Sequence, residues 1–136
     1  TETESKLSLV NKANLHILLV EDNDDVRHFL SQSLSEAYNI REAINGVDAL
    51  AKIEEDKPDL IISDLMMPQM GGLEATRRIR KMDREDAESI PIFAMTANAF
   101  LDDIAQSKAA GMNEHFSKPL QMEKVIDTIR FYCTAR

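Results

Sequence analysis

The sequence predicts an α/β domain built on an open, doubly wound parallel sheet. Five short apolar runs alternate with stretches of helical spacing, and the runs over 15–20, 59–64 and 91–96 are almost uninterrupted in apolar residues. Strands covered by helices on both faces read in this way, whereas a strand with one face in water alternates. Five strand–helix units with short connections and right-handed crossovers give the open sheet.

The remaining strand candidates span 39–43 and 114–117. A stretch of helical spacing follows each strand, and Asn23 is placed to cap the first of these helices. Gly111 suits the position just after the fourth helix, where the backbone adopts a positive φ. The residues expected on the apolar helix faces are, in chain order, Val26, Phe29, Leu30, Ser33, Leu34 and Ala37; Val47, Leu50 and Ile53; Leu73, Thr76, Ile79 and Met82; Ile104, Ala105, Lys108 and Ala109; and Met122, Val125, Ile126, Ile129, Tyr132 and Cys133.

Length and composition favour one globular domain over 15–136, preceded by a polar linker or tail over 1–14. The formal net charge of −8 argues against a nucleic-acid surface. The single cysteine, Cys133, excludes an internal disulfide and is expected to be a buried small hydrophobe. Since neither a membrane-length apolar run nor a signal peptide is visible, we expect a cytoplasmic location without direct membrane contact. The first residue is Thr1, which favours a processed chain or a piece of a longer protein.

Three carboxylates, a hydroxyl and an ammonium group stand at the ends of the predicted strands. Glu21 and Asp22 follow the first strand, Asp64 ends the third, Thr96 ends the fourth and Lys118 follows the fifth. In open α/β sheets the ligand crevice lies outside the carboxyl ends of the strands, so we expect these side chains to share one crevice. Each also has a plainer interpretation: a helix-dipole partner for the acid pair, a loop residue for Asp64, a helix N-cap for Thr96 and a solvated lysine.

This set of groups is suited to accepting a phosphoryl group. Mg²⁺ prefers oxygen ligands and is usually held by one or two carboxylates and several waters. A bound divalent cation would keep Asp64 ionised beside its acidic neighbours, and a carboxylate can attack phosphorus to form an aspartyl phosphate. Proline disfavours helical geometry in the residue before it, so Lys118 is held extended, where its charge can neutralise a phosphoryl oxygen.

The pattern resembles the receiver domain of two-component response regulators over about residues 15–134. The residues that carry the resemblance are Glu21-Asp22, Asp64 with Met67-Pro68-x-Met70-Gly71-Gly72, Thr96-Ala97 and Lys118-Pro119. The resemblance implies a flavodoxin-like sheet of five parallel strands in the order 2-1-3-4-5. It also implies that Asp64 accepts a phosphoryl group from the phosphohistidine of a histidine kinase, with onward transfer to a histidine phosphotransfer protein left open.

The same resemblance implies the ligands of a metal ion. Mg²⁺, with Mn²⁺ as an alternative, would be held by Asp22 and Asp64, by Glu21 through water and by the backbone carbonyl of Met66. Thr96 and Lys118 would contact the phosphoryl group. Such a domain catalyses only its own phosphorylation and dephosphorylation.

The sequences of 72–80, 94–99 and 111–113 are most similar to those of receivers attached to hybrid histidine kinases. If this domain comes from such a protein, the parent would itself be a kinase. Whether such a parent is anchored in a membrane stays open. A stand-alone single-domain response regulator is the alternative. The stimulus, the cognate kinase and the oligomeric state are not identified by the sequence.

Two positions depart from the pattern of the family. Gly71 replaces an acid, which is expected to weaken the cap of the third helix. His115 stands three residues before Lys118, where tyrosine or phenylalanine is usual. Strand alternation puts Phe116 inward as core and His115 outward, where it is either an ordinary exposed histidine or a switch. As a switch, it would move with Thr96 and couple phosphorylation to the face of the fourth helix, last strand and fifth helix, with a dependence on pH.

The sequence disfavours three other classes of protein. A phosphatase of the haloacid dehalogenase type would need a second Asp two residues after Asp64, where Met66 stands. An FMN-binding module would need a phosphate-cradling loop after the first strand, and Asn23-Asp24-Asp25 would repel phosphate. A degenerate receiver is disfavoured because every acceptor-site position is filled. We expect the Met66 side chain to lie over the phosphoryl group and to slow its hydrolysis.

Overall fold

The computed structural model describes residues 15–83, 85, 87–97 and 101–134, with the side chains of 101–103 and 134 left aside. The predicted linker over 1–14 lies outside the described residues. The elements in chain order are β1 (His16–Val20), α2 (Asp24–Ser35), β2 (Asn39–Ala43), α3 (Gly46–Glu55), β3 (Leu60–Asp64), α4 (Gly72–Arg80), β4 (Ile92–Thr96), α5 (Leu101–Ala110), β5 (Glu114–Ser117) and α6 (Met122–Thr134).

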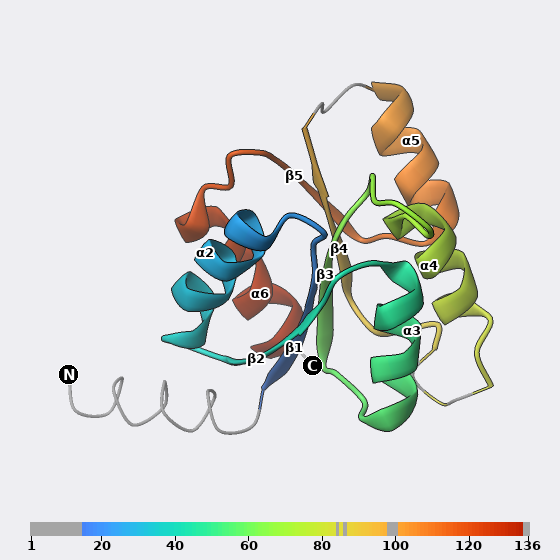
Figure 1. Cartoon of the computed structure of the whole chain (residues 1–136), viewed down its shortest axis with the longest axis horizontal. Helices are drawn as coiled ribbons and strands as arrows, with labels where there is room; N and C mark the ends of the chain where they lie inside the picture. The colour runs from blue at the N-terminus through green and yellow to red at the C-terminus, as the bar shows by residue number, and fades with distance from the viewer. Residues whose placement is uncertain (1–14, 84, 86, 98–100, 135–136) are drawn as a thin grey trace.

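The five strands form one parallel sheet in the order β2-β1-β3-β4-β5, which confirms the predicted fold class. Helices α2 and α6 cover one face, and α3, α4 and α5 cover the other (Figure 1). The three strands that read as continuous apolar runs are β1, β3 and β4, which are the interior strands. Each has a strand on both sides and helices on both faces, so nearly all of its side chains are buried.

Alternate strand residues fill two separate cores. Ile17, Leu19 and Phe93 pack with residues of α2 and α6, including Leu34 and Ile129. Their neighbours Leu18, Ile61 and Ile92 pack on the other side with residues such as Ile53 and Ile79. This division follows from the strand period of two, and it also decides to which side each residue at a strand end points.

The predicted helix faces are correct at their centres in α2, α3, α4 and α6, and wrong at two edge positions and over most of α5. Phe29 and Val47 were expected in the core, but both are exposed. In α5, Ala105, Lys108 and Ala109 are exposed, and Ser107 and Ala110 are the buried residues over 104–110. The α5 error has a clear cause, because the buried Ser107 is polar and so was not counted as a core position.

The ends of the helices agree with the sequence. Asn23 caps α2 by accepting a hydrogen bond from the Val26 amide at 3.0 Å. Gly111 follows α5 with φ of 113°, a value that favours glycine. Gly71 precedes α4 and makes no side-chain cap, as expected from its replacement of an acid. Cys133 is half-buried against the core of α2 and α6. Within the described part of the chain, no helix combines the length and apolar character needed to cross a membrane.

Candidate phosphoryl-acceptor site

The strand register brings the predicted site residues to one end of the sheet. Val20 pairs with Ser63, so the next residues along, Glu21 and Asp64, leave the sheet side by side. Strand β4 lies between β3 and β5, and on its β5 side Thr96 pairs with Ser117. The Lys118 amide then donates to the Thr96 carbonyl at 2.8 Å, which extends the ladder by one step. The Lys118–Pro119 peptide bond is cis.

Glu21, Asp22 and Asp64 form one acidic cluster. One carboxylate oxygen from each lies within 4.8 Å of the others. Glu21 is 1% exposed and Asp64 is 7% exposed, whereas Asp22 is open to solvent. Burying a carboxylate costs free energy unless a positive charge lies beside it, so this cluster needs cations nearby.

Lys118 is the cation that the chain itself supplies. Its Nζ donates to Glu21 Oε1 at 2.7 Å and to Asp64 Oδ2 at 3.0 Å. Burial alone would lower the pKa of Lys118, but the hydrogen bonds and charges of Glu21 and Asp64 outweigh it, and the pKa is raised. The ammonium group therefore stays charged between the two buried acids.

Close packing behind Asp64 fixes the end of β3. The Ser63 hydroxyl donates to the Asp64 carbonyl at 2.9 Å. The first residue of α4, Gly72, lies so close to this carbonyl that a Cβ there would collide with its oxygen. The Leu65 amide donates to the Met95 carbonyl at 3.1 Å, so the peptide that follows Asp64 is held at both its carbonyl and its amide.

The acidic cluster fits a small hard cation. Three carboxylate oxygens within 4.8 Å of one another match in kind the preference of Mg²⁺ for a few protein oxygens and several waters. The exposure of Asp22 leaves one side open to water. The backbone carbonyl of Met66 stays a prediction as a further ligand.

Thr96, His115 and Met66 are the other site residues predicted from the sequence. Thr96 is buried, and strand alternation places it with Ile92 and Ala94 on the side of the sheet that α3, α4 and α5 cover. His115 lies on that same side and is half-buried, not exposed, with its Nε2 in a short hydrogen bond with the Ser107 hydroxyl of α5. Phe116 faces the opposite core, as predicted, at a ring-centroid distance of 5.6 Å from Phe93. The Met66 side chain is 82% exposed.

Two features beside the site were missed from the sequence. Arg27 of α2 donates to the Glu21 carbonyl, although a lone arginine in a helix carries no sequence signal. A groove of about 610 Å³ also lies next to Lys118, and Phe29, which helical spacing had placed in the core, lines it. The groove is formed by Asp25, Val26, Phe29, Leu30, Lys118, Pro119 and Leu120.

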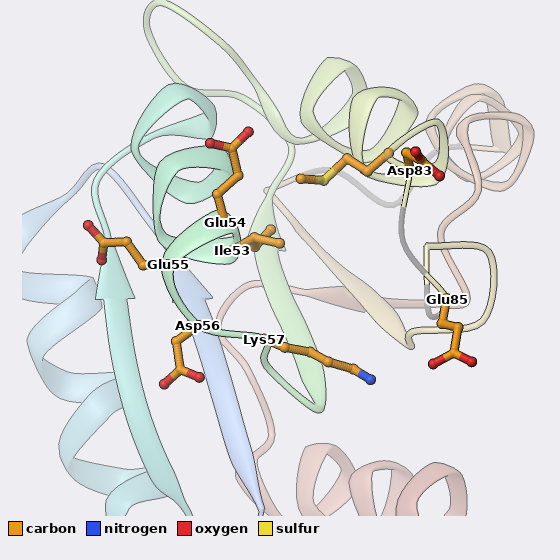
Figure 2. A pocket seen from close by; sticks show the side chains of 8 residues that line it. Ile53, Glu54, Glu55, Asp56, Lys57, Asp83 and Glu85 are labelled. Carbon is orange, nitrogen blue, oxygen red and sulfur yellow. The ribbon is translucent and has the colours of Figure 1, made fainter.

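A second hollow, of about 790 Å³, lies at the other end of the sheet. It is lined by the end of α3, the segment before β3 and the loop after α4, and Figure 2 shows its mostly acidic side chains. The residues that form it are Ile53, Glu54, Glu55, Asp56, Lys57, Met82, Asp83 and Glu85. Because these segments precede β3 and β4, the hollow is separate from the acidic cluster at the carboxyl ends of the strands.

The family model for the response regulator receiver domain matches residues 17–130. Sporulation initiation phosphotransferase F of Bacillus subtilis (strain 168) is 34% identical over 120 residues, which are 88% of this chain and 94% of that protein. The chemotaxis protein CheY4 of Vibrio cholerae has a TM-score of 0.81 at 29% identity, with 87% of this chain and 98% of that chain covered. The signal receiver domain of a signal transduction histidine kinase from Syntrophus aciditrophicus has a TM-score of 0.79 at 27% identity, with 88% and 90% covered.

Receiver domains bind Mg²⁺ at an acidic pocket and interact with histidine kinases or phosphotransfer proteins. The sheet order, the acidic cluster at the carboxyl ends of the strands and the match over most of the chain agree with one another. The chain therefore belongs to the response regulator receiver domains of two-component signalling.

Proposed function

We propose that this domain takes a phosphoryl group onto Asp64 from the phosphohistidine of a histidine kinase. The supporting observation is the place of the Asp64 carboxylate. It is buried at the end of the central strand, clustered with Glu21 and Asp22, and lies 3.0 Å from the Lys118 ammonium group. In this proposal residues 15–136 form the receiver unit and 1–14 a linker.

In the transfer, an Asp64 oxygen bonds to phosphorus while the phosphorus–nitrogen bond of the phosphohistidine breaks, and the leaving imidazole takes up a proton. Mg²⁺, or Mn²⁺, would be held by Asp22, Asp64, Glu21 through water and the Met66 carbonyl, and would supply positive charge to the phosphoryl oxygens. The Lys118 ammonium group neutralises a phosphoryl oxygen. The Thr96 hydroxyl is proposed to donate to another.

The groove beside Lys118 is proposed as the docking place of the donor. Its lining is largely apolar, and Phe29 is 62% exposed on α2. A helix that carries the phosphohistidine could lay its apolar face in this groove and bring the phosphoryl group to the adjacent acceptor site. The partner is then the helical phosphohistidine domain of a kinase, or a histidine phosphotransfer protein for onward transfer.

Acetyl phosphate with Mg²⁺, followed by intact-mass measurement, tests the acceptor assignment. Wild-type protein and the Asp56→Asn control, which changes an exposed acid at the far end, should each gain one phosphoryl group. Asp64→Asn should gain none. A gain in Asp64→Asn equal to that of wild type would place the acceptor elsewhere.

The same assay with a phosphorylated histidine kinase domain tests the groove. Phe29→Ser should accept from acetyl phosphate at the wild-type rate and from the protein donor more slowly. Phe131→Ser is the matched control, because Phe131 is exposed on α6 outside the groove. Equal rates from the protein donor in both variants would contradict docking at this place.

A hybrid histidine kinase is the proposed parent. The wording of 72–80 and the similarity to the histidine-kinase receiver of Syntrophus aciditrophicus support it. A stand-alone regulator is the second candidate, supported by the coverage of 94% of sporulation initiation phosphotransferase F. The size of the endogenous protein on an immunoblot separates the two.

Thr96 and His115 are proposed to form the switch. Both lie on the side of the sheet covered by α5, so movement of one can reach the face of α5, β5 and α6 through the other. Amide exchange with and without acetyl phosphate should change in α5 and β5. No change there in the phosphorylated protein would contradict this switch.

A further inference from the structure

Arg27 joins three acceptors around the turn between β1 and α2. Its Nη1 donates to the Glu21 carbonyl at 2.9 Å, its Nε to Glu42 Oε1 at 3.0 Å and its Nη2 to Asp24 Oδ1 at 2.6 Å. The Arg27 side chain is 15% exposed. A planar guanidinium with three partners in fixed directions has little freedom to move, and neither has the carbonyl that it binds.

The Glu21 carbonyl belongs to the peptide that leads into Asp22. On one side of this peptide, the Glu21 amide donates to the Ala43 carbonyl at 3.0 Å. On the other side, the Asn23 amide donates to Glu21 Oε2 at 3.1 Å, and Asn23 caps α2. Asp22 is the exposed residue between these fixed points. Arg27 therefore holds the first of the two peptides that flank Asp22 and orient its side chain.

We infer that Arg27 is a positioning residue for the metal site: it holds the Glu21–Asp22 turn so that the acidic cluster is formed before a cation binds. The inference rests on the proposed function, since it concerns the same site. Arg27 touches neither the phosphoryl group nor the cation in this role. It acts through the Glu21 carbonyl, with Glu42 of the neighbouring strand as its anchor.

Charge and positioning predict opposite signs for the loss of Arg27. Removing a cation next to an acidic cluster makes the potential there more negative, which by itself strengthens the binding of Mg²⁺. Loss of a group that orients metal ligands typically weakens metal affinity by about 10–100-fold. A weaker site in Arg27→Ala therefore cannot come from the change of charge.

Calorimetric titration of the unphosphorylated protein with MgCl₂ provides the test. The apparent dissociation constant of Arg27→Ala should rise by about 10-fold or more. Arg27→Lys should recover part of the affinity, because one ammonium group cannot reach all three acceptors. Glu42→Gln weakens the anchor, leaves the carbonyl contact in place, and should give a smaller rise.

Arg41→Ala is the matched control, because Arg41 also bonds backbone carbonyls and an acid, but at the end of α3 far from the site. Its affinity for Mg²⁺ should equal that of wild type. Thermal melting in EDTA identifies folded variants, and Glu42→Gln and Arg27→Lys keep the test decisive if Arg27→Ala does not fold.

Unchanged or tighter Mg²⁺ binding by folded Arg27→Ala would overturn the inference while leaving phosphorylation of Asp64 intact. Equal weakening in Arg41→Ala would overturn it as well. If wild-type protein binds no Mg²⁺ and takes no phosphoryl group, the proposed function fails, and this inference fails with it.

Discussion

At the scale of single residues, Lys118 supplies the positive charge beside the buried acids of the candidate acceptor site. Its ammonium group is the partner of two buried carboxylates, and the pKa of Lys118 is raised because these partners outweigh its burial. The cost of removing one member of a buried ion pair is large because the other charge is left without a partner. The two acids make the lysine more important for stability than its exposure alone indicates.

We therefore expect Lys118→Ala to lower the free energy of unfolding by about 2 kcal/mol, less than for a fully buried pair because the side chain is partly exposed. Urea unfolding in EDTA at pH 7 measures this loss, and MgCl₂ should recover part of it. The control is Lys81→Ala, which removes an exposed lysine after α4. If Lys118→Ala is as stable as wild type in EDTA, the Lys118 ammonium group does not offset the cost of burying Glu21 and Asp64.

At the scale of elements, β5 is joined to α5 through His115. The Ser107 hydroxyl donates to the Ile104 carbonyl at 3.0 Å and also forms a short hydrogen bond with His115 Nε2. Burial lowers the pKa of His115, the charge of Lys108 lowers it further, and Glu114 opposes both. The folded protein consequently favours the neutral imidazole.

The lowered pKa of His115 fixes how the stability of the folded protein depends on pH. The unfolded chain binds the proton near the ordinary histidine pKa of about 6.5, and the folded chain binds it only at lower pH. Stability from His115 is complete above pH 6.5 and is lost as the pH falls towards the lowered pKa. Between pH 8 and pH 5, the melting temperature of His115→Gln should fall less steeply than that of wild type. His28→Gln, at an exposed histidine of α2, should follow wild type, and identical slopes in all three proteins would contradict the prediction.

The elements also show what the sequence could and could not predict. Continuous apolar runs located β1, β3 and β4 to within one residue, because burial on both faces leaves little choice of side chain. The buried face of α5 was misassigned, because Ser107 is buried through its bonds to Ile104 and His115 and not through its apolarity. Periodicity detects apolar burial and is blind to a polar side chain whose partners come from another element.

The same reasoning applies to the acceptor site. Glu21, Asp22, Asp64 and Lys118 could be grouped from the sequence because strand ends are visible and parallel strands end together. Arg27 could not, because the distance between a helix side chain and a turn carbonyl is set by tertiary packing. The strand order itself came from resemblance to a family and is now seen in the sheet.

At the scale of the whole molecule, the acidic cluster and the contacts of Arg80 lie at opposite ends of the sheet. Arg80, at the end of α4, donates to the Gly111 carbonyl at 2.7 Å and the Ile90 carbonyl at 2.7 Å. It also bonds the Ala87 carbonyl at 3.2 Å and Asn113 Oδ1 at 3.0 Å. One guanidinium thus joins the loop before β4 to the loop before β5, and burial lowers the pKa of Arg80.

Arg80 should therefore affect stability and leave phosphoryl chemistry unchanged. Removing it leaves several carbonyls without donors, and we expect Arg80→Ala to lose about 3 kcal/mol of unfolding free energy. Arg80→Lys should recover little, because an ammonium group cannot reproduce the planar fork. Arg78→Ala is the control on the same helix. Among the contacts of the described residues, exposed Arg78 pairs only with exposed Glu74, so its loss should leave the free energy of unfolding close to that of wild type. Urea unfolding gives the free energies, and acetyl phosphate uptake by the folded variants, measured well below melting, should match wild type. A slower uptake by folded Arg80→Ala would mean that the two ends of the sheet are coupled.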